Sequence, residues 1–535
     1  MKLSQLEADL KSRARAAFSL GEEAMAGFAL AAPPPLIKHA DVSIAWPIAG
    51  AKLLRKAPLK IAEEFAAALA PDYEAQAVPP GFVNLKLTDA LLLESAAGLD
   101  KPGYYERPDF KGQKINLEFV SANPTGPMHL ASGRGATLGD SLARIMRLLG
   151  AELATEFYVN NVGRQVELLG KSLKARLEGK EPPEGGYQGE YLKALATALP
   201  AEAAGWEDKQ FSEYAVGEML KLHKADMKAF GVEFDRWFLE SELHEQGGPA
   251  KALATLKERG MTYEKEGAVW FGASTELEAD DKDRVLVKAD GRNTYFLNDI
   301  AYHLNKFSRG FTRLIDIWGA DHHGYVPRME AAVKALGGTG SFKVLIHQQV
   351  ALKRGEELVK MSKRAGDFIS LKELVDEVGP DACRFFFASR GPHTHLNFDV
   401  DLAKKKSNEN PVFYVQYVHA RICSIFSNAP EKGIDPAAGF DASKAALSPE
   451  ERALLMKLLW LEKALADCTR DYSPHPVTTY LTELAALFHS FYDKHKVLDP
   501  EHKETSACRL FILKEVKGVI ALGLALLGVS APERM

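Results

Sequence analysis

Two stretches of this 535-residue chain combine residue types that bind and transfer phosphate groups. The first, residues 121–135, reads SANPTGPMHLASGRG and contains His129 and Ser132. It joins a predicted strand to a predicted helix, and backbone N–H groups at such a junction hold anions with help from the helix dipole. The second, residues 353–366, carries five cations within fourteen residues, between glycines. A loop of this kind closes over a polyphosphate and stabilises the charge that develops during transfer.

Each stretch taken alone also has a simpler interpretation. A histidine in a loop rich in glycine and proline is more often structural than catalytic, and a run of charge is more often a solvated turn than a binding site. Only the two stretches together, in the right structural context, indicate nucleotide chemistry.

That context is an alternation of strands and helices in the middle of the chain. A strand at 115–120, the loop, a helix at 133–149 and a strand at 156–159 form the opening unit of a parallel α/β sheet, which binds its ligand at the carboxyl ends of the strands. The alternation returns later, with strands expected at 284–288, 314–318 and 343–347 and helices expected at 325–336 and 371–378.

The regions on either side have a different character. Before residue 108, a capping box of Ser4 and Glu7 and an alternating strand at 83–87 predict a small α/β unit. After about residue 400 the pattern predicts helices only, at 411–426, from Ser448 through Leu465, at 477–495 and at 507–527. We therefore expect a multidomain α/β protein with three domains: a small N-terminal α/β domain (1–108), a Rossmann-like parallel-sheet domain (109–400) and an all-α helical bundle (401–535).

Composition limits the classes of function. Hydrophobic residues make up 46% of the chain, and 67 Lys and Arg against 72 Asp and Glu leave a formal net charge of −5. This balance excludes a histone-like protein but not an enzyme with one basic face. No apolar run reaches the roughly 18–20 residues that span a bilayer, and the first residues do not read as a signal peptide. The four cysteines form no CxxC pair, so we expect a cytoplasmic protein without disulfides or a zinc site.

Longer motifs narrow the interpretation to one family. They are SANPTGPMH, EFYVNNVGRQVELLG (156–170), GVEFDRWFLES (231–241), YFLNDIAYHLNKF (295–307), DIWGADHHGYVPRM (316–329), VKMSKRAG (359–366), NPVFYVQYVHAR (410–421) and LGVSAPERM (527–535). In this order they resemble bacterial arginyl-tRNA synthetases of class I over essentially the whole chain. The resemblance implies an N-terminal domain that touches the tRNA elbow, a catalytic domain and a C-terminal anticodon-binding domain. It also implies ATP-dependent ligation of arginine to tRNA(Arg) through an arginyl-adenylate, with activation that requires bound tRNA.

The resemblance assigns ATP binding to the two phosphate-binding stretches. The residues are His129, Leu130, Ala131, Ser132, Gly133, Lys360, Met361, Ser362 and Lys363, with His129, Ser132, Lys360 and Lys363 as catalytic candidates. Mg²⁺ is expected to accompany ATP, without a dedicated protein metal site.

The first signature departs from the family. Its usual form is His-x-Gly-His, and here it reads His129-Leu130-Ala131-Ser132. Ala131 adds a methyl group where adenine approaches the backbone, and Ser132 offers only a neutral hydroxyl. Removing a polar interaction with the transition state, with nothing in its place, costs on the order of 2–4 kcal/mol. Two alternatives follow: an active enzyme with a tolerated variant, which the intact second signature favours, or a tRNA-binding paralogue with weakened catalysis.

Recognition of arginine requires acceptors for a planar guanidinium group with five donors, and carboxylates do this best. The resemblance points to Asn123 for the α-amino end of the substrate, and to Tyr295 and Asp299 for its side chain. The spacing of Tyr295 and Asp299 places both on one helix face. Specificity for cysteine or methionine would require an apolar or zinc-binding pocket, and the sequence has no clustered cysteine ligands, so these two residues favour a cationic amino acid.

Further candidates for the arginine pocket carry alternatives. The carboxylate of Glu264 is one candidate, with Glu266 as the alternative. Asp321 and His322, next to His323, invite a metal interpretation, but neighbouring residues rarely reach one zinc ion together, so substrate binding is the stronger expectation.

The tRNA-binding candidates lie in both terminal domains. They are Phe82, Asn84, Lys404, Tyr414, Tyr417, Arg421 and Met535. Exposed aromatic side chains can stack on unpaired bases, but the two tyrosines are also spaced as core residues would be, and the lysine run 404–406 is equally consistent with a solvated face. A monomer is the expected state.

Overall fold

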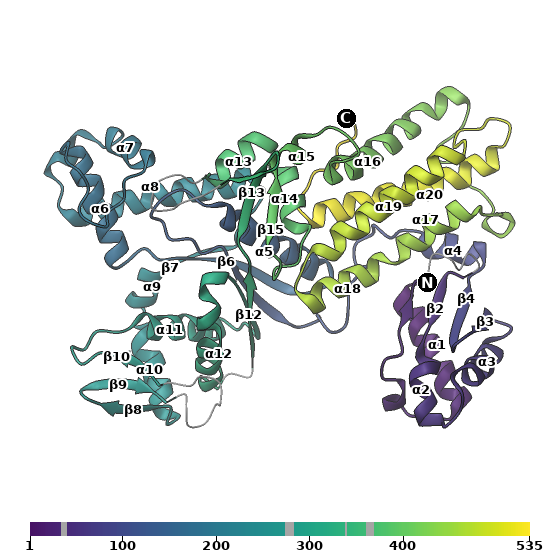
Figure 1. Ribbon diagram of the computed structural model, residues 1–535, viewed down its shortest axis with the longest axis horizontal. Helices are drawn as coiled ribbons and strands as arrows, with labels where there is room; N and C mark the ends of the chain where they lie inside the picture. Colours follow the sequence, from purple (N-terminus) through teal and green to yellow (C-terminus); the bar gives the residue numbers. More distant parts are fainter. Residues whose placement is uncertain (34–39, 273–282, 338–339, 360–368) are drawn as a thin grey trace.

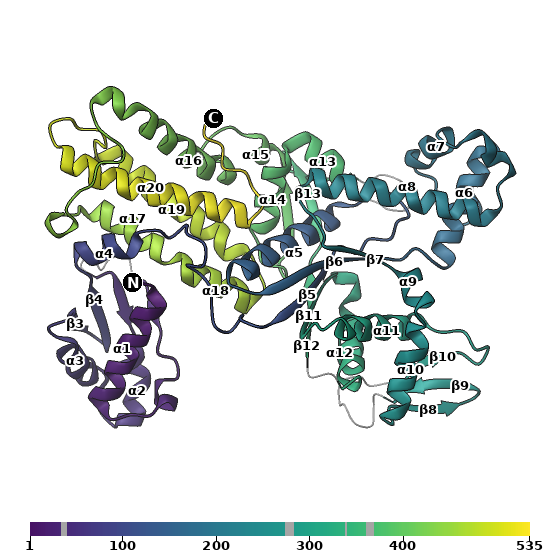
Figure 2. The ribbon, with the colours of Figure 1, turned by 180° about the vertical axis from the view of Figure 1, so that it is seen from behind.

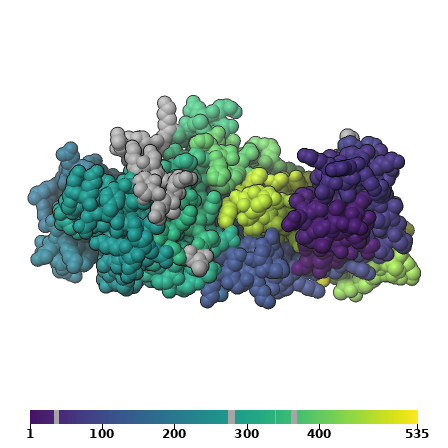
Figure 3. Space-filling model, turned by 90° about the horizontal axis from the view of Figure 1, so that it is seen from below, coloured from purple at the N-terminus to yellow at the C-terminus, as the bar shows by residue number. Residues whose placement is uncertain are grey.

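The computed structural model describes residues 1–33, 40–272, 283–337, 340–359 and 369–535. The molecule is elongated, with a small N-terminal unit at one end and a group of helices at the other (Figures 1 and 2). A parallel sheet lies between them, and the C-terminal helical bundle extends from the sheet over the N-terminal unit (Figures 1 and 2). Seen from below, the N-terminal residues again lie at one end and residues around 200–300 at the other (Figure 3).

The N-terminal unit is a four-stranded antiparallel sheet in the order β1-β2-β4-β3, with α2 and α3 packed on β4 and α1 packed on α3. Its elements are α1 (Leu3–Phe18), β1 (Leu30–Ala31), β2 (Val42–Ile44), α2 (Trp46–Leu54), α3 (Pro58–Leu69), β3 (Glu74–Val78) and β4 (Phe82–Lys86). The strand predicted at 83–87 is confirmed, because Val83 and Leu85 of β4 are fully buried.

The predicted start of α1 is wrong. The helix begins at Leu3, where Gln5 Oε1 accepts a hydrogen bond from the backbone N–H of Lys2 at 2.9 Å. The backbone N–H of Ser4 donates instead to Glu462 in the C-terminal bundle, at 3.1 Å. A contact between domains therefore takes the group that a local capping box would have used.

The central sheet has five parallel strands in the order β12-β11-β5-β6-β7. They are β5 (Lys114–Phe119), β6 (Glu152–Val159), β7 (Arg236–Leu239), β11 (Arg313–Gly319) and β12 (Ser341–His347). Helix α5 (Leu130–Leu148) packs on β5, β6 and β11. Gly139 permits this close approach, because a Cβ at that position would stand 2.1 Å from the ring of Phe119 on β5. The parallel sheet predicted from the sequence is confirmed.

One predicted strand belongs to a different sheet. β10 (Arg284–Val287) pairs antiparallel with β9 (Ala268–Phe271), which pairs antiparallel with β8 (Thr262–Lys265). The two residues between β8 and β9 are Glu266 (φ 54°) and Gly267 (φ 74°), and two positive φ angles make a tight hairpin turn. β10 extends this hairpin rather than the parallel sheet.

Helices fill the crossovers of the central region. An insertion between β6 and β7 holds α6 (Arg164–Leu177), α7 (Glu190–Thr197) and α8 (Asp208–Ala229), with its own core around Leu173 and Phe211. The remaining elements are α4 (Asp89–Ala96), α9 (Glu240–Glu245), α10 (Gly248–Glu258), α11 (Tyr295–Ser308), the 3₁₀ helix η3 (Ala320–Tyr325), α12 (Val326–Ala335), β13 (Val350–Arg354), β14 (Glu357–Val359), α13 (Leu371–Val378), α14 (Pro380–Ala388) and β15 (Leu396–Asp399).

The last part of the chain is helical, as predicted. Its helices are α15 (Val400–Lys404), α16 (Pro411–Asn428), α17 (Pro449–Leu459), α18 (Leu461–Asp471), α19 (His475–Lys494) and α20 (Lys503–Leu526). Ser448 caps α17 as expected, since its Oγ accepts the N–H of Glu451 at 3.2 Å. The helix expected to continue through Leu465 instead breaks at Trp460 into α17 and α18. Within the residues described above, no helix is both long and apolar enough to cross a membrane.

Candidate functional site

The first candidate residues lie at the start of α5. His129 has an extended backbone (φ −87°, ψ 168°) and occupies the N-cap position, so α5 begins at Leu130, three residues earlier than predicted. Ala131 and Ser132 are half-buried in the first helical turn, and Gly133 is buried. A Cβ on Gly133 would stand 2.5 Å from Leu371 Cδ1, so glycine allows α5 to pack against α13.

The start of α5 is joined to the chain that follows the second signature. His129 forms an antiparallel bridge with Ser370, and the N–H of Leu371 donates to the carbonyl of Met128 at 2.9 Å. Lys360, Met361, Ser362 and Lys363 themselves lie outside the described residues. Before that segment in the chain, Arg354 makes a two-bond ion pair with Glu377, at 2.6 Å for each bond.

The loop after β5 contains a backbone turn of high conformational cost. Val120 and Ser121 have φ angles of 69° and 40°, in the left-handed region that β-branched residues avoid. Ser121 Oγ stabilises this turn, because it donates to Glu118 Oε1 at 2.8 Å and accepts the N–H of Tyr158 at 3.0 Å.

The insertion α6–α8 supports the rest of the same loop. Asn123 is exposed, and its Nδ2 donates to Gln165 Oε1 of α6 at 3.0 Å. Tyr191 Oη donates to the carbonyl of Thr125 at 2.7 Å, and His223 Nε2 lies 2.8 Å from the carbonyl of Gly126. Burial lowers the pKa of His223, so its neutral ring donates through Nε2–H. Sequence reasoning did not find these supports, because they come from a part of the chain far from the loop.

The first turns of α11 carry Tyr295 and Asp299. The side chain of Tyr295 is 67% exposed, whereas Asp299 is half-buried. Tyr325 Oη donates to Asp299 Oδ2 at 2.5 Å. Burial raises the pKa of Asp299 to about 6; the hydrogen bond from Tyr325 opposes this rise, and the carboxylates of Glu240 and Glu118 add to it. The surroundings of Asp299 therefore disfavour negative charge unless a cation joins them.

Two further groups face this acidic region. Tyr158 is the second-last residue of β6, and burial and the charges of Glu240 and Asp299 raise its pKa. Glu240 is buried and accepts a hydrogen bond from Asn298 Nδ2 at 3.1 Å. Neither Tyr158 nor Glu240 was identified from the sequence as a site residue, although both lie in the motifs that carry the resemblance.

Asp321, His322 and His323 lie just beyond the carboxyl end of β11, on η3. All three are exposed, and His322 Nε2 is 3.6 Å from Asp321 Oδ2. Among the residues that the structure describes, no group of three His, Cys, Asp or Glu side chains is arranged to hold a metal ion. Their position at the strand end agrees with the expected ligand-binding edge of the sheet.

Glu264 lies on the antiparallel hairpin of β8 and β9, not on the parallel sheet. It is exposed on β8, its carboxylate lies 3.9 Å from Lys257 Nζ, and β8 is the strand of its sheet drawn farthest from α5 (Figures 1 and 2). The alternative, Glu266, is exposed in the turn that follows. The hairpin places Glu264 next to Lys257, and Glu264 or the alternative Glu266 stays a pocket candidate on the resemblance alone.

Two buried polar side chains near the end of β12, Arg134 and His347, were not identified from the sequence. Arg134 on α5 is fully buried and donates to the carbonyls of Gln348, Gly391 and Thr394 at 2.8–2.9 Å. Burial lowers the pKa of His347, at the end of β12, to about 4, so its ring is neutral at physiological pH. Arg134 thus anchors the segment after β12 to the helix that carries the first signature.

The tRNA candidates of the C-terminal bundle lie on α16. Tyr414 and Tyr417 are half-buried and stack on His489 of α19, with ring centroids 4.7 and 6.1 Å apart. Arg421 donates to Tyr492 Oη at 2.8 Å. Met535 is 54% exposed. The tyrosines are therefore neither core residues nor free rings, but part of an aromatic face shared by α16 and α19.

Two other candidates are constrained by their neighbours. Lys404 Nζ pairs with Glu377 Oε1 at 2.6 Å, so its charge is partly used within the protein. Asn84 is only 5% exposed and lies in register between Ser43 of β2 and Gln76 of β3, while Phe82 opens β4 and is half-buried.

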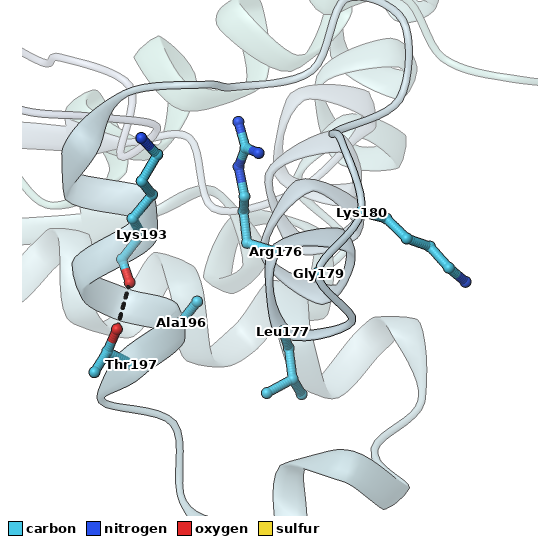
Figure 4. Close-up of a pocket in the computed structure, with 7 residues that line it drawn as sticks. All are labelled: Arg176, Leu177, Gly179, Lys180, Lys193, Ala196 and Thr197. Carbon is cyan, nitrogen blue, oxygen red and sulfur yellow. Dashed lines mark hydrogen bonds between the residues drawn. The ribbon is translucent and has the colours of Figure 1, made fainter.

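A pocket of about 360 Å³ lies away from these residues, between α6 and α7 (Figure 4). Arg176, Lys180 and Lys193 line it, and each of them pairs with a neighbouring glutamate. This pocket contains none of the residues that carry the chemistry described above.

Comparisons with known proteins agree with the motifs. Residues 4–87 match the family model for the arginyl tRNA synthetase N terminal domain, residues 99–386 that for tRNA synthetases class I (R), catalytic domain, and residues 415–535 that for the DALR anticodon binding domain. The chain is 54% identical over 507 residues to the arginine–tRNA ligase of Elusimicrobium minutum, with 94% of each chain covered. It is 43% identical over 521 residues to that of Thermotoga maritima, covering 94% of this chain and 95% of the relative.

A solved structure shows the same fold. The arginyl-tRNA synthetase of Thermus thermophilus superimposes with a TM-score of 0.79 at 24% identity, covering 99% of this chain and 100% of the other. The matched models and the identity over nearly the full length place the protein in one group: the chain belongs to the arginyl-tRNA synthetase family of class I aminoacyl-tRNA synthetases.

Proposed function

We propose that this protein activates arginine with ATP, forming arginyl-adenylate and diphosphate, and then transfers the arginyl group to the 3′ end of tRNA(Arg) with release of AMP. Family membership supports the reaction class, and the site described above supports the choice of amino acid. The alternative of a tRNA-binding paralogue rests only on the changed first signature, and the comparisons do not favour it.

The observation that carries the choice of arginine is the charge state around Asp299. Its carboxylate is half-buried, close to Glu240 and Glu118, with a pKa raised to about 6. A guanidinium group would supply the missing positive charge and donate paired hydrogen bonds to a carboxylate. A neutral amino-acid side chain would leave the charge uncompensated, so the pocket favours a cation.

The remaining roles in the amino-acid pocket follow from position. We assign Asn123 to the α-amino end of arginine, because it follows β5 on the loop braced by Ser121, Tyr191 and His223. Tyr295 is exposed enough to cover the bound side chain from the rim. Asp321 and His322 occupy the neighbouring strand end and are assigned to substrate binding.

ATP is proposed to lie at the start of α5, with Mg²⁺ bound to its phosphates. The bridge between His129 and Ser370 supports this placement, because it brings the first signature next to the chain that follows residues 360–368. Lys360 and Lys363 would stabilise the charge that develops on the phosphates. Ser132 is proposed to contact a phosphate or the ribose, directly or through water.

For tRNA, we propose that domain 1–108 touches the elbow through Phe82, with the buried Asn84 of the same strand as a supporting residue, and that domain 401–535 binds the anticodon. The aromatic face of Tyr414 and Tyr417, with Arg421 and Met535, supports base stacking. We propose that Lys404 contacts tRNA only when it exchanges its ion pair with Glu377 for a contact with the tRNA. We further propose a monomer that acts in the cytoplasm, where free thiols such as those of this chain persist.

Steady-state aminoacylation tests these assignments. Asp299→Asn should raise the KM for arginine far more than the KM for ATP, because the substitution removes only the charge that pairs with the guanidinium group. Ser132→Ala should do the reverse. Equal effects of Asp299→Asn on both KM values would refute the guanidinium role, and an unchanged ATP KM and rate in Ser132→Ala would refute the contact of Ser132 with ATP.

A further inference from the structure

We propose that Lys306 is a positioning residue for arginine recognition, which fixes helix α11 over the parallel sheet so that Asp299 and Asn123 face the same ligand. The proposal rests on the arginine pocket proposed above and concerns a residue outside it.

The sheet presents a row of three buried carboxylates beneath α11. Asp316 of β11 is in register with Glu118 of β5, and Glu118 is in register with Glu156 of β6. All three side chains are buried. Like charges on neighbouring strands repel one another, so this row requires cations between its members.

Helix α11 and its C-cap residue Arg309 supply these cations. Lys306 is fully buried, and its Nζ lies 2.5 Å from Glu118 Oε2 and 2.8 Å from Asp316 Oδ1. Arg309 pairs with both oxygens of Glu156, at 2.6 and 2.8 Å. Lys306 is therefore the one group among these that bridges two strands, β5 and β11, to the helix.

His303 connects the same row to Asp299, the residue proposed to bind the guanidinium group of arginine. Its Nε2 lies 2.9 Å from Asp316 Oδ2, and its Nδ1 lies 2.7 Å from the backbone carbonyl of Asp299. Asp299, His303 and Lys306 share one helix face, because they are spaced four and three residues apart. Burial raises the pKa of Asp316, but the charges of Lys306 and His303 outweigh this effect and lower the pKa overall, so Asp316 is ionised and holds both.

The middle member of the row, Glu118, reaches the loop of Asn123. Glu118 accepts a hydrogen bond from Ser121 Oγ at 2.8 Å, at the left-handed turn of Val120 and Ser121. Because such a turn costs free energy, the contacts that hold it determine whether Asn123 is presented correctly. A continuous set of contacts thus runs from Asp299 through Lys306 to the Asn123 loop.

Buried ion pairs contribute little net stability, and their best-established role is to specify register. A slide of α11 by one turn would move Asp299 by about 5.4 Å and destroy a bidentate guanidinium contact. Lys306 makes that slide unfavourable, because any shift would leave Glu118 and Asp316 unpaired and buried.

The test compares Lys306→Met with Arg384→Met. Arg384 of α14 is also a fully buried cation, paired with Asp140 of α5, but it contacts none of the arginine-pocket residues named above. Both variants should unfold at a lower temperature. Only Lys306→Met should raise the KM for arginine, by about tenfold or more, with the KM for ATP within about twofold of wild type.

A second pair of variants preserves side-chain size in case the methionine variants do not fold. Asp316→Asn should raise the arginine KM, and Asp140→Asn should leave it unchanged. Lys306→Arg, which keeps the charge, should raise the arginine KM less than Lys306→Met does.

Three outcomes separate the claims. An arginine KM that rises selectively in Lys306→Met and Asp316→Asn supports the proposal. An unchanged arginine KM in these variants, or equal rises in the Arg384 and Asp140 controls, overturns the proposed role of Lys306. The proposed arginine pocket still stands in that case if Asp299→Asn raises the arginine KM selectively. If Asp299→Asn itself leaves the arginine KM unchanged, the pocket fails, and the role of Lys306 fails with it.

Discussion

Tyr325 Oη donates a hydrogen bond to Asp299 Oδ2 across 2.5 Å, and this contact joins α11 to the end of η3. It stabilises the ionised carboxylate only in part, because burial still holds the pKa of Asp299 near 6. The pocket is thus prepared for a cationic ligand before the ligand arrives, and this preparation has consequences that can be measured.

The affinity for arginine should depend on pH through Asp299. A protonated carboxyl cannot pair with a guanidinium group, and its pKa is raised by burial to about 6. The KM for arginine should therefore be constant above pH 7 and rise by about tenfold per unit as the pH falls below 6. Aminoacylation rates measured from pH 5 to 8 at varied arginine check this, and a flat profile in wild type would contradict it.

Ionised Asp299 should also destabilise the protein when no arginine is bound. Its folded pKa of about 6 lies above the ordinary value of 3.8, so ionisation above pH 6 favours the unfolded chain. Asp299→Asn, which can still accept the hydrogen bond from Tyr325, should stabilise the protein at pH 8 by up to about 3 kcal/mol. The gain should shrink below pH 6 and vanish near pH 4. Urea unfolding at several pH values measures it, and destabilisation at pH 8 would refute this reasoning.

The left-handed turn before Asn123 should depend on Ser121. Ser121→Ala removes the bonds to Glu118 and Tyr158, so the arginine KM should rise several-fold while the ATP KM changes little. Glycine adopts positive φ without the cost that Val120 incurs, and Val120→Gly added to Ser121→Ala should recover part of the loss. Kinetics of the single and double variants decide the matter; a double variant worse than Ser121→Ala alone would argue against stored strain.

Arg452 of α17 should couple the N-terminal unit to the helical bundle. It donates to Asp41 Oδ2 at 2.6 Å and to the carbonyl of Leu87 at 2.8 Å, and it also pairs with Asp89. Arg452→Ala removes the cation that pairs with both carboxylates and should destabilise this contact by about 1–3 kcal/mol. The KM for tRNA should then rise with little change in the KM for arginine.

A matched control for Arg452 exists on the neighbouring helix. Lys463 of α18 pairs with Asp467 on the surface of one helix, so Lys463→Ala should change neither KM. Limited proteolysis provides an independent measure, because a loosened N-terminal unit should be cleaved from Arg452→Ala faster than from the control. Equal cleavage and equal tRNA KM would show that Arg452 does not fix the unit.

The sequence predicts most of the elements because their signals are local. Helix α13 occupies the predicted residues 371–378, since Ser370 and Glu373 form the capping box that begins it. The start of α5 was missed because His129 caps the helix without a side-chain hydrogen bond, so it leaves no signal in residue type. The break at Trp460 was missed because the apolar spacing continues across it.

The site was less predictable, since its geometry depends on contacts between distant residues. Asp299 could be identified from motif and spacing, whereas the pairing of Lys306 with Glu118 and Asp316 joins residues 188 and 10 positions away. Glu264 is a pocket candidate by resemblance alone, and it lies on the antiparallel hairpin of β8 and β9 rather than on the parallel sheet. Whether a residue reaches the site depends on the register between strands and helices. Local residue types do not encode that register.

The most direct test of the account is aminoacylation of total bacterial tRNA by the purified protein, with each radiolabelled amino acid in turn. We predict charging with arginine alone, dependent on ATP, and its loss in Lys360→Ala, which should still bind tRNA. Tight tRNA binding without charging of any amino acid would show that the change from His-x-Gly-His to His129-Leu130-Ala131-Ser132 has abolished catalysis, and charging with another amino acid would contradict the assignment of Asp299.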